Sequence, residues 1–117
     1  MDESRAVDAL AALAQPTRLT VFRRLIAAHP DAVTAGEIAR HCGVPHNTLS
    51  SHLAVLARAG LVTVRRDGRM MFYAVALDGF RALIAFLMRD CCQGRAEICA
   101  PLITELDCRA AMKEPSA

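Results

Sequence analysis

Apolar positions follow two different periods along the 117 residues of the chain. Up to residue 60 they recur every three or four residues, as on one face of a helix. This spacing predicts four helices, at residues 4–14, 16–29, 34–42 and 45–60. The period then becomes extended, and β-branched and aromatic side chains predict strands at residues 61–66 and 69–75. Helical spacing returns in a long apolar segment that Asp78 is expected to cap.

The fourth predicted helix has the clearest pattern. Pro45 suits the first position of a helix and Gly60 suits its end. Leu49, Leu53 and Leu56 recur at i, i+4 and i+7, which makes one narrow apolar stripe. Short hydrogen-bonding side chains lie opposite the stripe in the first half of the helix. Such a helix fits a DNA major groove, although an ordinary amphipathic helix with a polar outer face explains this stretch equally well.

The neighbouring segments favour the DNA-binding interpretation. Thr34 and Glu37 form a capping box that opens the third helix, and Gly43 closes it shortly before the fourth. Two short helices joined by a tight glycine-containing turn are typical of a helix-turn-helix. The sequence therefore predicts a helix-turn-helix followed by a hairpin.

The hairpin is predicted from Asp67-Gly68. Both positions of such a two-residue hairpin loop need positive φ, and an Asp-Gly pair is typical there. Counting outward from that loop pairs Arg66 with Arg69, and Arg65 lies beside them. Like charges placed opposite each other destabilise a sheet, so an anionic partner such as DNA is expected at the tip. A tip kept soluble by its charge is the alternative.

The first and last predicted helices favour a homodimer. The first is expected to begin at a Ser4 cap and to keep Val7 and Leu10 on its apolar face. The last is apolar around more than half of its circumference up to Gly94, so it must be buried. With 54% hydrophobic residues in so short a chain, we expect these two helices to pack against a second subunit.

Charge is unevenly distributed although the net charge is only +2. Residues 1–17 carry −2, residues 18–69 carry +5 and residues 70–117 carry −1. The excess therefore lies on the segment with the predicted helix-turn-helix, as phosphate binding requires, although a solvated basic surface is also common.

The length predicts one domain, residues 1–112, with a flexible tail at 113–117. No apolar run reaches the roughly 18 residues of a membrane span, so no membrane partner is expected. The first residues are acidic and polar, unlike a signal peptide, and we expect a cytoplasmic protein.

Four motifs together give the chain a specific resemblance. They are Leu-Ala-Gln-Pro-Thr-Arg-Leu at 13–19, Gly-Glu-Ile-Ala at 36–39, Ser-Ser-His-Leu-Ala-Val-Leu-Ala-Arg-Ala-Gly-Leu-Val at 50–62 and Arg-Arg-Asp-Gly-Arg-x-x-x-Tyr at 65–73. The chain resembles the ArsR/SmtB family of metalloregulatory repressors over roughly residues 5–92. The resemblance implies a mainly α winged helix-turn-helix with a small β-hairpin, dimerised through its N- and C-terminal helices. It also implies binding to an inverted repeat in double-stranded operator DNA, and release by an inducer.

The resemblance also indicates which positions face DNA. These are Asn47, Thr48, Ser50 and Ser51 on the fourth helix, with Arg65, Arg66 and Arg69 on the wing. His52 falls within the same motif, but its helical phase is near the leucine stripe. We therefore expect it to be partly packed, with at most a phosphate contact.

The chain has five cysteines, and these are the candidate ligands of an inducer. Cys42 is alone on the third helix, so the family's Cys-x-Cys arsenic pair cannot be completed there, and we expect Cys42 to be a core residue. All four histidines precede the hairpin, so a zinc, nickel or cobalt site on the last helix is not expected. What remains is Cys91, Cys92 and Cys99, with Cys108 further on.

Three thiolates without a nitrogen or oxygen ligand suit a soft ion. Trivalent arsenic or antimony takes three sulfurs, whereas zinc or cadmium would use a fourth ligand, which Cys108 could supply. The arrangement is similar to that of family members whose arsenic site is a vicinal cysteine pair plus one downstream cysteine. As(III) or Sb(III) is therefore the expected inducer, with incidental thiols as the alternative.

Three other functions fit parts of the pattern. In a thiol-redox or persulfide sensor, Cys91 or Cys92 would bridge to Cys99. A small thiol reductase is not expected, because no Cys-x-x-Cys stands at a helix start and no histidine lies in the C-terminal half. The chain is therefore not expected to be an enzyme. A constitutive architectural DNA binder is the third alternative.

Overall fold

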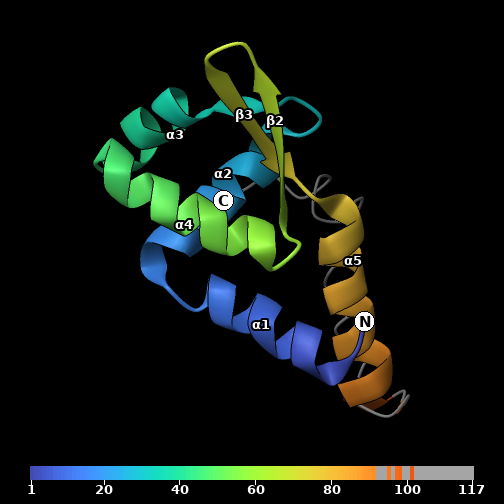
Figure 1. Ribbon diagram of the computed structural model, residues 1–117. Coiled ribbons are helices and arrows are strands. Elements are labelled where there is room, and N and C mark those ends of the chain that lie inside the picture. The colour runs from blue at the N-terminus through green and yellow to red at the C-terminus, as the bar shows by residue number, and fades with distance from the viewer. Residues whose placement is uncertain (92–94, 96, 99–100, 102–117) are drawn as a thin grey trace, which may run out of the picture. The chain divides into compact units, whose positions relative to one another are not determined.

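The computed structural model describes residues 1–91, 95, 97, 98 and 101 of the chain. Residues 1–83 form one compact unit, and the chain from residue 84 onward is a second. The elements are α1 (Glu3–Leu13), α2 (Pro16–Ala28), β1 (Val33–Thr34), α3 (Ala35–Cys42), α4 (His46–Arg58), β2 (Val62–Asp67), β3 (Met70–Val75) and α5 (Leu77–Ala85), followed by a π-helix (Phe86–Cys91) (Figure 1). This order is that of a winged helix-turn-helix, and it confirms the predicted fold class.

The core of the first unit lies where α2, α3 and α4 meet the sheet. Leu49, Leu53 and Leu56 are all at most 1% exposed, which confirms the predicted stripe on α4. They share the core with Leu25 of α2 and Ile38 of α3, both fully buried. Because three leucines of α4 are fixed in this way, the opposite face of the helix is held outward.

The ends of α3 and α4 are set by local sequence. The Thr34 hydroxyl accepts a hydrogen bond from the Glu37 amide at 3.3 Å, and Gly43 ends α3 with φ +64°, as predicted. Pro45 is the N-cap of α4 rather than its first helical residue. Gly60 follows the helix with φ +78°, where the Gly60 amide donates to Ala57 O at 3.0 Å and the Leu61 amide to Leu56 O at 3.1 Å. This is a Schellman ending, which only a residue tolerant of positive φ makes without strain.

The wing is a three-stranded antiparallel sheet in the order β1-β3-β2. The predicted register was wrong: Asp67 pairs with Met70 and Arg66 with Met71, two residues beyond its predicted partner, so the loop is Gly68-Arg69, one residue later than predicted. Gly68 has φ +63°, which fits glycine at the first position of such a loop. The predicted pairing of Arg66 with Arg69 is therefore absent.

Strand β1 was not predicted. It is only two residues long, Val33 and Thr34, and pairs with Tyr73 and Phe72 of β3. The strand fixes the start of α3 to the wing, because Thr34 is both a strand residue and the N-cap of α3. The hairpin of β2 and β3 projects beside α3 from the body that α1 to α4 form (Figure 1).

Helix α1 differs from the prediction in its cap, and its buried stripe was not predicted. Asp2, not Ser4, is the N-cap, and its carboxylate accepts from the Arg5 amide at 2.8 Å. A stripe of alanines, Ala6, Ala9 and Ala12, faces the core. Val7 and Leu10, expected on the apolar face, are 56% and 42% exposed. The helix packs through its smallest side chains and leaves its larger apolar ones uncovered.

Helix α5 begins at Leu77, so Asp78 lies in its first turn and is not the cap. A carboxylate in the first turn still stabilises the helix, because it lies near the positive end of the helix dipole. The α-helix ends at Ala85 and the chain continues as a π-helix to Cys91, whereas a single helix to Gly94 was expected. No helix in the described part of the chain is long and apolar enough to span a membrane.

Candidate nucleic-acid interface

The outward face of α4 presents the polar side chains that the sequence predicted. Asn47, Thr48, Ser50 and Ser51 are all exposed. Asn47 Oδ1 accepts from the Thr48 amide at 2.9 Å, and the Ser50 hydroxyl donates to His46 O at 3.2 Å. The amide NH₂ of Asn47 and the hydroxyls of Thr48 and Ser51 have no hydrogen-bond partner among the described residues. They are therefore free to bind an external acceptor or donor.

His52 is partly buried, as predicted, and it contacts α2. Arg18 Nη1 lies 3.3 Å from His52 Nδ1. A guanidinium has no acceptor, so in this hydrogen bond Arg18 donates and Nδ1 accepts. This hydrogen bond uses the tautomer of His52 that has no proton on Nδ1. The role of His52 is to join α4 to α2, and a phosphate contact stays a prediction.

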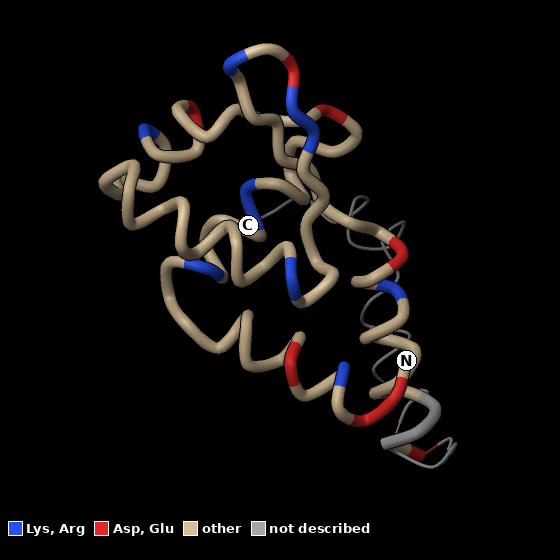
Figure 2. Tube along the Cα trace, in the orientation of Figure 1, with Lys and Arg blue, Asp and Glu red and all other residues tan. Residues whose placement is uncertain are grey.

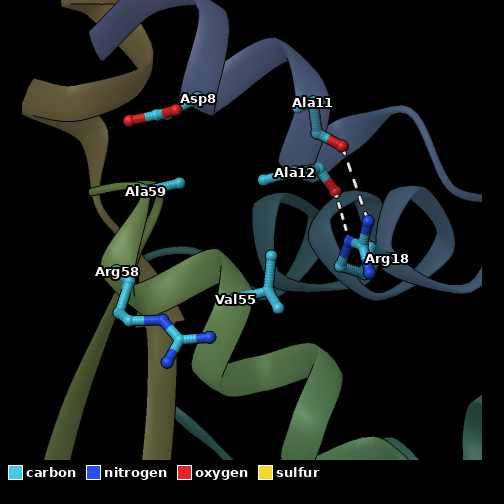
Figure 3. Close-up of a pocket in the computed structure, with 7 residues that line it drawn as sticks. All are labelled: Asp8, Ala11, Ala12, Arg18, Val55, Arg58 and Ala59. Atoms are coloured by element: carbon cyan, nitrogen blue, oxygen red, sulfur yellow. Dashed lines mark hydrogen bonds between the residues drawn. The ribbon is translucent and has the colours of Figure 1, made fainter. Parts of the chain in front are cut away.

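Arg18 also holds the end of α1. Its Nε donates to Ala12 O at 2.6 Å and its Nη2 lies 3.5 Å from Ala11 O (Figure 3). One side chain of α2 therefore binds both the last turn of α1 and His52 of α4. This role of Arg18 was not predicted, because its only signal in the sequence was the place of Arg18 in the 13–19 motif.

The wing arginines gather near the tip of the hairpin (Figure 2). The Arg65 guanidinium lies over the Phe72 ring, 4.8 Å from its centroid, which orients it against the sheet. Arg66 Nε donates to Gly68 O at 3.4 Å. All three arginines, including Arg69, are exposed, and Asp67 beside them offsets one of their charges. The net charge of this tip is therefore positive, as the sequence predicted.

A cavity of about 400 Å³ separates the wing from the helix-turn-helix. It brings Arg69 of the wing together with Arg40 of α3 and His46 of α4, and Glu37 is the one carboxylate in its lining. Arg40 and His46 were not among the predicted DNA-facing residues, because nothing local to either residue indicates that it lies opposite the wing. They extend the basic surface from the wing onto α3 and α4.

The predicted inducer site lies almost wholly beyond the described residues. Cys92, Cys99 and Cys108 are outside them, and Cys91 is described only as the last residue of the π-helix. Among the described residues no group of three or more His, Cys, Asp or Glu side chains is placed to hold a metal ion.

Cys42, which is not one of the predicted ligands, is half-buried at the end of α3. Burial raises the pKa of the Cys42 thiol above its ordinary value, and the Arg24 guanidinium offsets only part of the rise. The thiol form is therefore favoured, as expected for a packed cysteine rather than a reactive one.

Comparison with known proteins agrees with this geometry. Residues 13–65 match a model described as a helix-turn-helix domain. The chain is 32% identical to the transcriptional activator HlyU of Vibrio cholerae over 79% of this chain and 82% of HlyU. A solved HlyU structure has a TM-score of 0.61 at 31% identity, covering 76% of this chain and 96% of that one. Another, described as reduced HlyU, has a TM-score of 0.59 at 31% identity, covering 74% and 87%.

Two further matches bear on assembly and ligand. The solution structure of Mb0332 from Mycobacterium bovis has a TM-score of 0.61 at 28% identity, over 69% of this chain and 73% of that one. It is described as a homodimeric winged helix-turn-helix DNA-binding domain and a possible ArsR-family transcriptional regulator. A probable mercury resistance operon repressor of Streptomyces lividans is 36% identical over 55% of this chain and 49% of that repressor.

Proposed function

The chain belongs to the ArsR family of winged helix-turn-helix transcriptional regulators, and we propose that it is a homodimeric repressor that a thiophilic ligand releases from operator DNA. The observation that carries the DNA-binding part is the outward polar face of α4. Its side chains are exposed, and the leucine stripe behind them holds the helix in place. In this proposal Asn47, Thr48, Ser50 and Ser51 contact base edges or phosphates in a major groove. Arg65, Arg66 and Arg69 bind the adjacent backbone or minor groove.

The dimer is supported by the uncovered apolar side chains of α1. Val7 and Leu10 would lie in water in a monomer, although the core has a place only for the alanines of this helix. The related Mb0332 domain is homodimeric, which supports a second copy of this chain as their cover. A two-fold dimer places its recognition helices one helical turn apart, so the operator is proposed to be an inverted repeat.

Replacing both Val7 and Leu10 by glutamate is expected to give a monomer. Charged side chains cannot be buried in an apolar interface without a partner, and each costs several kcal/mol. Light scattering after size exclusion measures the mass directly. Met70→Glu is the matched control, because Met70 is 52% exposed but lies on the wing, and this variant should stay dimeric. A double variant with the mass of the wild-type dimer would contradict the proposed interface.

The inducer is proposed to be As(III) or Sb(III), bound by Cys91, Cys92 and Cys99. Support comes from the donor set, because three thiols without other ligands select soft ions. The similarity to a probable mercury resistance operon repressor agrees with a thiophilic ligand. Zn²⁺ or Cd²⁺ with Cys108 as fourth ligand is the nearest alternative.

The experiment is a fluorescence anisotropy titration of operator DNA bound to the protein. Arsenite, antimonite, Zn²⁺ and Cd²⁺ are added in turn, first to the wild type and then to Cys91→Ser, Cys92→Ser and Cys99→Ser. Arsenite should weaken DNA binding by roughly 150-fold at the upper end of typical allosteric coupling, and each variant should abolish the effect. Cys42→Ser is the control and should respond like the wild type. If all three serine variants still release DNA, the proposed site is wrong.

A thiol-redox or persulfide switch is the second candidate, favoured by the similarity to HlyU, one structure of which is described as reduced. In that case Cys91 or Cys92 would form a disulfide with Cys99. An oxidant in metal-free buffer would then release the DNA as well as arsenite does, and dithiothreitol would restore binding. Release by arsenite under reducing conditions favours the first candidate.

Cys42 is expected to titrate at higher pH in the folded protein than in the unfolded one. Its pKa is raised, so the thiolate that reacts with iodoacetamide forms only at higher pH in the folded state. The measurement is the pH profile of alkylation in a variant whose other four cysteines are serine, with and without urea. The midpoint of the rate should move to lower pH in urea. An unchanged midpoint, or a shift to higher pH, would show that the surroundings of Cys42 do not disfavour the thiolate.

A further inference from the structure

We propose that Arg18 is a positioning residue, which sets the orientation of the recognition helix α4 according to the position of α1. The inference rests on the proposed function, because it gives Arg18 a part in DNA binding. Arg18 lies on α2 and is not one of the residues proposed to contact DNA. It acts through His52 of α4, to which its guanidinium is hydrogen-bonded.

The guanidinium of Arg18 is shared between two helices. Its Nε and Nη2 face α1, where Nε donates to Ala12 O at 2.6 Å and Nη2 lies 3.5 Å from Ala11 O (Figure 3). Its third nitrogen, Nη1, lies 3.3 Å from His52 Nδ1. The base of the side chain is fixed as well, because the Arg18 amide donates to the Gln15 side chain at 2.7 Å. Since the group is planar and rigid, a shift of the two α1 carbonyls also moves Nη1.

The last turn of α1 is a favourable place for a cation to bind. Ala11 and Ala12 lie in that turn, and the last carbonyls of a helix have no partner further along it. A guanidinium there also faces the negative end of the helix dipole. Leu10, the residue before Ala11, belongs to the apolar face proposed for the dimer interface. A change in how two subunits pack through α1 would therefore displace the carbonyls that Arg18 binds.

Apolar packing leaves the rotation of α4 about its own axis weakly restrained. Leu49, Leu53 and Leu56 form one narrow buried stripe, and the burial of apolar surface has no preferred direction. A hydrogen bond depends on angle as well as distance, so the bond to His52 restricts this rotation. His52 directly follows Ser51 on the helix, and a rotation that breaks the bond also turns the DNA-facing side chains.

A cavity lies between α1 and α4 beside this link. It has a volume of about 390 Å³, and its lining includes side chains of both helices and Arg18 (Figure 3). Closely packed side chains transmit a displacement from one helix to the next, but side chains on opposite walls of a cavity do not touch. The hydrogen bonds of Arg18 therefore connect the two helices where direct packing is interrupted.

The test compares DNA binding by variants at the two ends of the bond. Anisotropy titrations use the full chain and a duplex that the wild-type protein selects from a random pool. His52→Leu removes the acceptor, and Arg18→Gln removes the charged planar donor. Each should weaken binding to this duplex by roughly tenfold, and the double variant should lose no more than either single one. The slope of log affinity against log salt should stay at the wild-type value, because neither change removes a phosphate contact.

Rescue by asparagine separates positioning from packing. The side-chain oxygen of asparagine is bonded to Cγ, as Nδ1 of histidine is, so His52→Asn keeps an acceptor in the equivalent place. This variant should bind the selected duplex within about threefold of the wild type, because the bond to Arg18 is kept. The matched control is His41→Leu, which removes an Arg–His bond of the same kind, between Arg24 Nη2 of α2 and His41 Nε2 of α3 at 2.9 Å. That bond does not involve α1 or α4, and the variant should bind like the wild type.

The inference is overturned if either His52→Leu or Arg18→Gln binds the selected duplex as tightly as the wild type, or if their losses multiply in the double variant. A smaller salt slope would also overturn it, since that would indicate a direct phosphate contact. Equal losses in His52→Asn and His52→Leu, or the same loss in His41→Leu, would show that the bond itself does not position α4. Circular dichroism checks that each variant is folded, and if Arg18→Gln is not, the two His52 variants decide. A wild-type chain that selects no duplex would contradict the proposed function, whereas variants that all match a DNA-binding wild type would contradict this inference alone.

Discussion

Replacing Gly79 by alanine is expected to destabilise the fold by about 3 kcal/mol, at the upper end of the cost of overpacking. A Cβ at this position would lie 1.8 Å from Gly60 O and 2.9 Å from Gly60 C. Both are backbone atoms of the turn that ends α4, and that turn is fixed by the hydrogen bonds of Gly60 and Leu61. Neither α5 nor the turn can yield without losing other contacts. Urea unfolding followed by circular dichroism measures the loss.

Two other glycines provide controls for this prediction. At Gly36, inside α3, a Cβ would meet only the end of the Arg40 side chain at 3.5 Å. Gly36→Ala should therefore be neutral or should stabilise the helix by about 0.5–1 kcal/mol. Gly68→Ala tests strain without crowding, since no atom lies within 4 Å and φ is +63°, and it should cost about 1–2 kcal/mol. If Gly79→Ala unfolds at the same urea concentration as the wild type, α5 does not approach α4 as described.

The triple change of Arg65, Arg66 and Arg69 to glutamine is expected to weaken binding to any DNA by roughly 100-fold or more at low salt. The three side chains are exposed at one end of the hairpin. If they bind phosphates, the loss of affinity on substitution should not depend on the DNA sequence. A dimer loses six cations, so the slope of log affinity against log salt should fall in magnitude by about 5. Anisotropy titrations at several salt concentrations give this slope.

Arg81→Gln is the control for charge alone, because Arg81 is exposed on α5 outside the candidate interface. It should leave the slope unchanged. Arg65→Lys separates charge from orientation, since lysine keeps the cation but not the planar group that lies over Phe72. A salt slope that stays at the wild-type value in the triple variant would show that the wing does not contact the DNA backbone.

Features with a local cause could be predicted from the sequence. The stripe of Leu49, Leu53 and Leu56, the capping box at Thr34 and the endings at Gly43 and Gly60 depend on residues within one or two turns of each other. Each has a single favourable arrangement, so the pattern determines it. The outward polar face of α4 follows from the stripe, and the candidate DNA-facing residues of that helix were found for the same reason.

Some features depend on a choice between two similar local arrangements or on distant contacts, and these could not be predicted. Asp67-Gly68 and Gly68-Arg69 are both possible two-residue loops, and pairing along β2 and β3 decides between them. On α1 both the alanine stripe and the Val7 face are apolar, so periodicity alone does not reveal which one faces the core. The bond from Arg18 to His52 spans 34 residues and has no local signal at all. The same is true of Arg40 and Arg69, which line one cavity.

The central claim, that α4 reads DNA sequence, is tested most directly by the specificity of Asn47→Ala. Duplexes selected from a random pool by the wild-type protein supply the site, which should be a near-palindrome with half-sites one helical turn apart. Anisotropy then compares the selected duplex with a scrambled one. Loss of a bidentate contact in each half-site should weaken binding to the selected duplex by at least roughly tenfold and leave the scrambled duplex almost unaffected. Equal affinities of wild type and variant for the selected duplex, or equal losses on both duplexes, would contradict the claim.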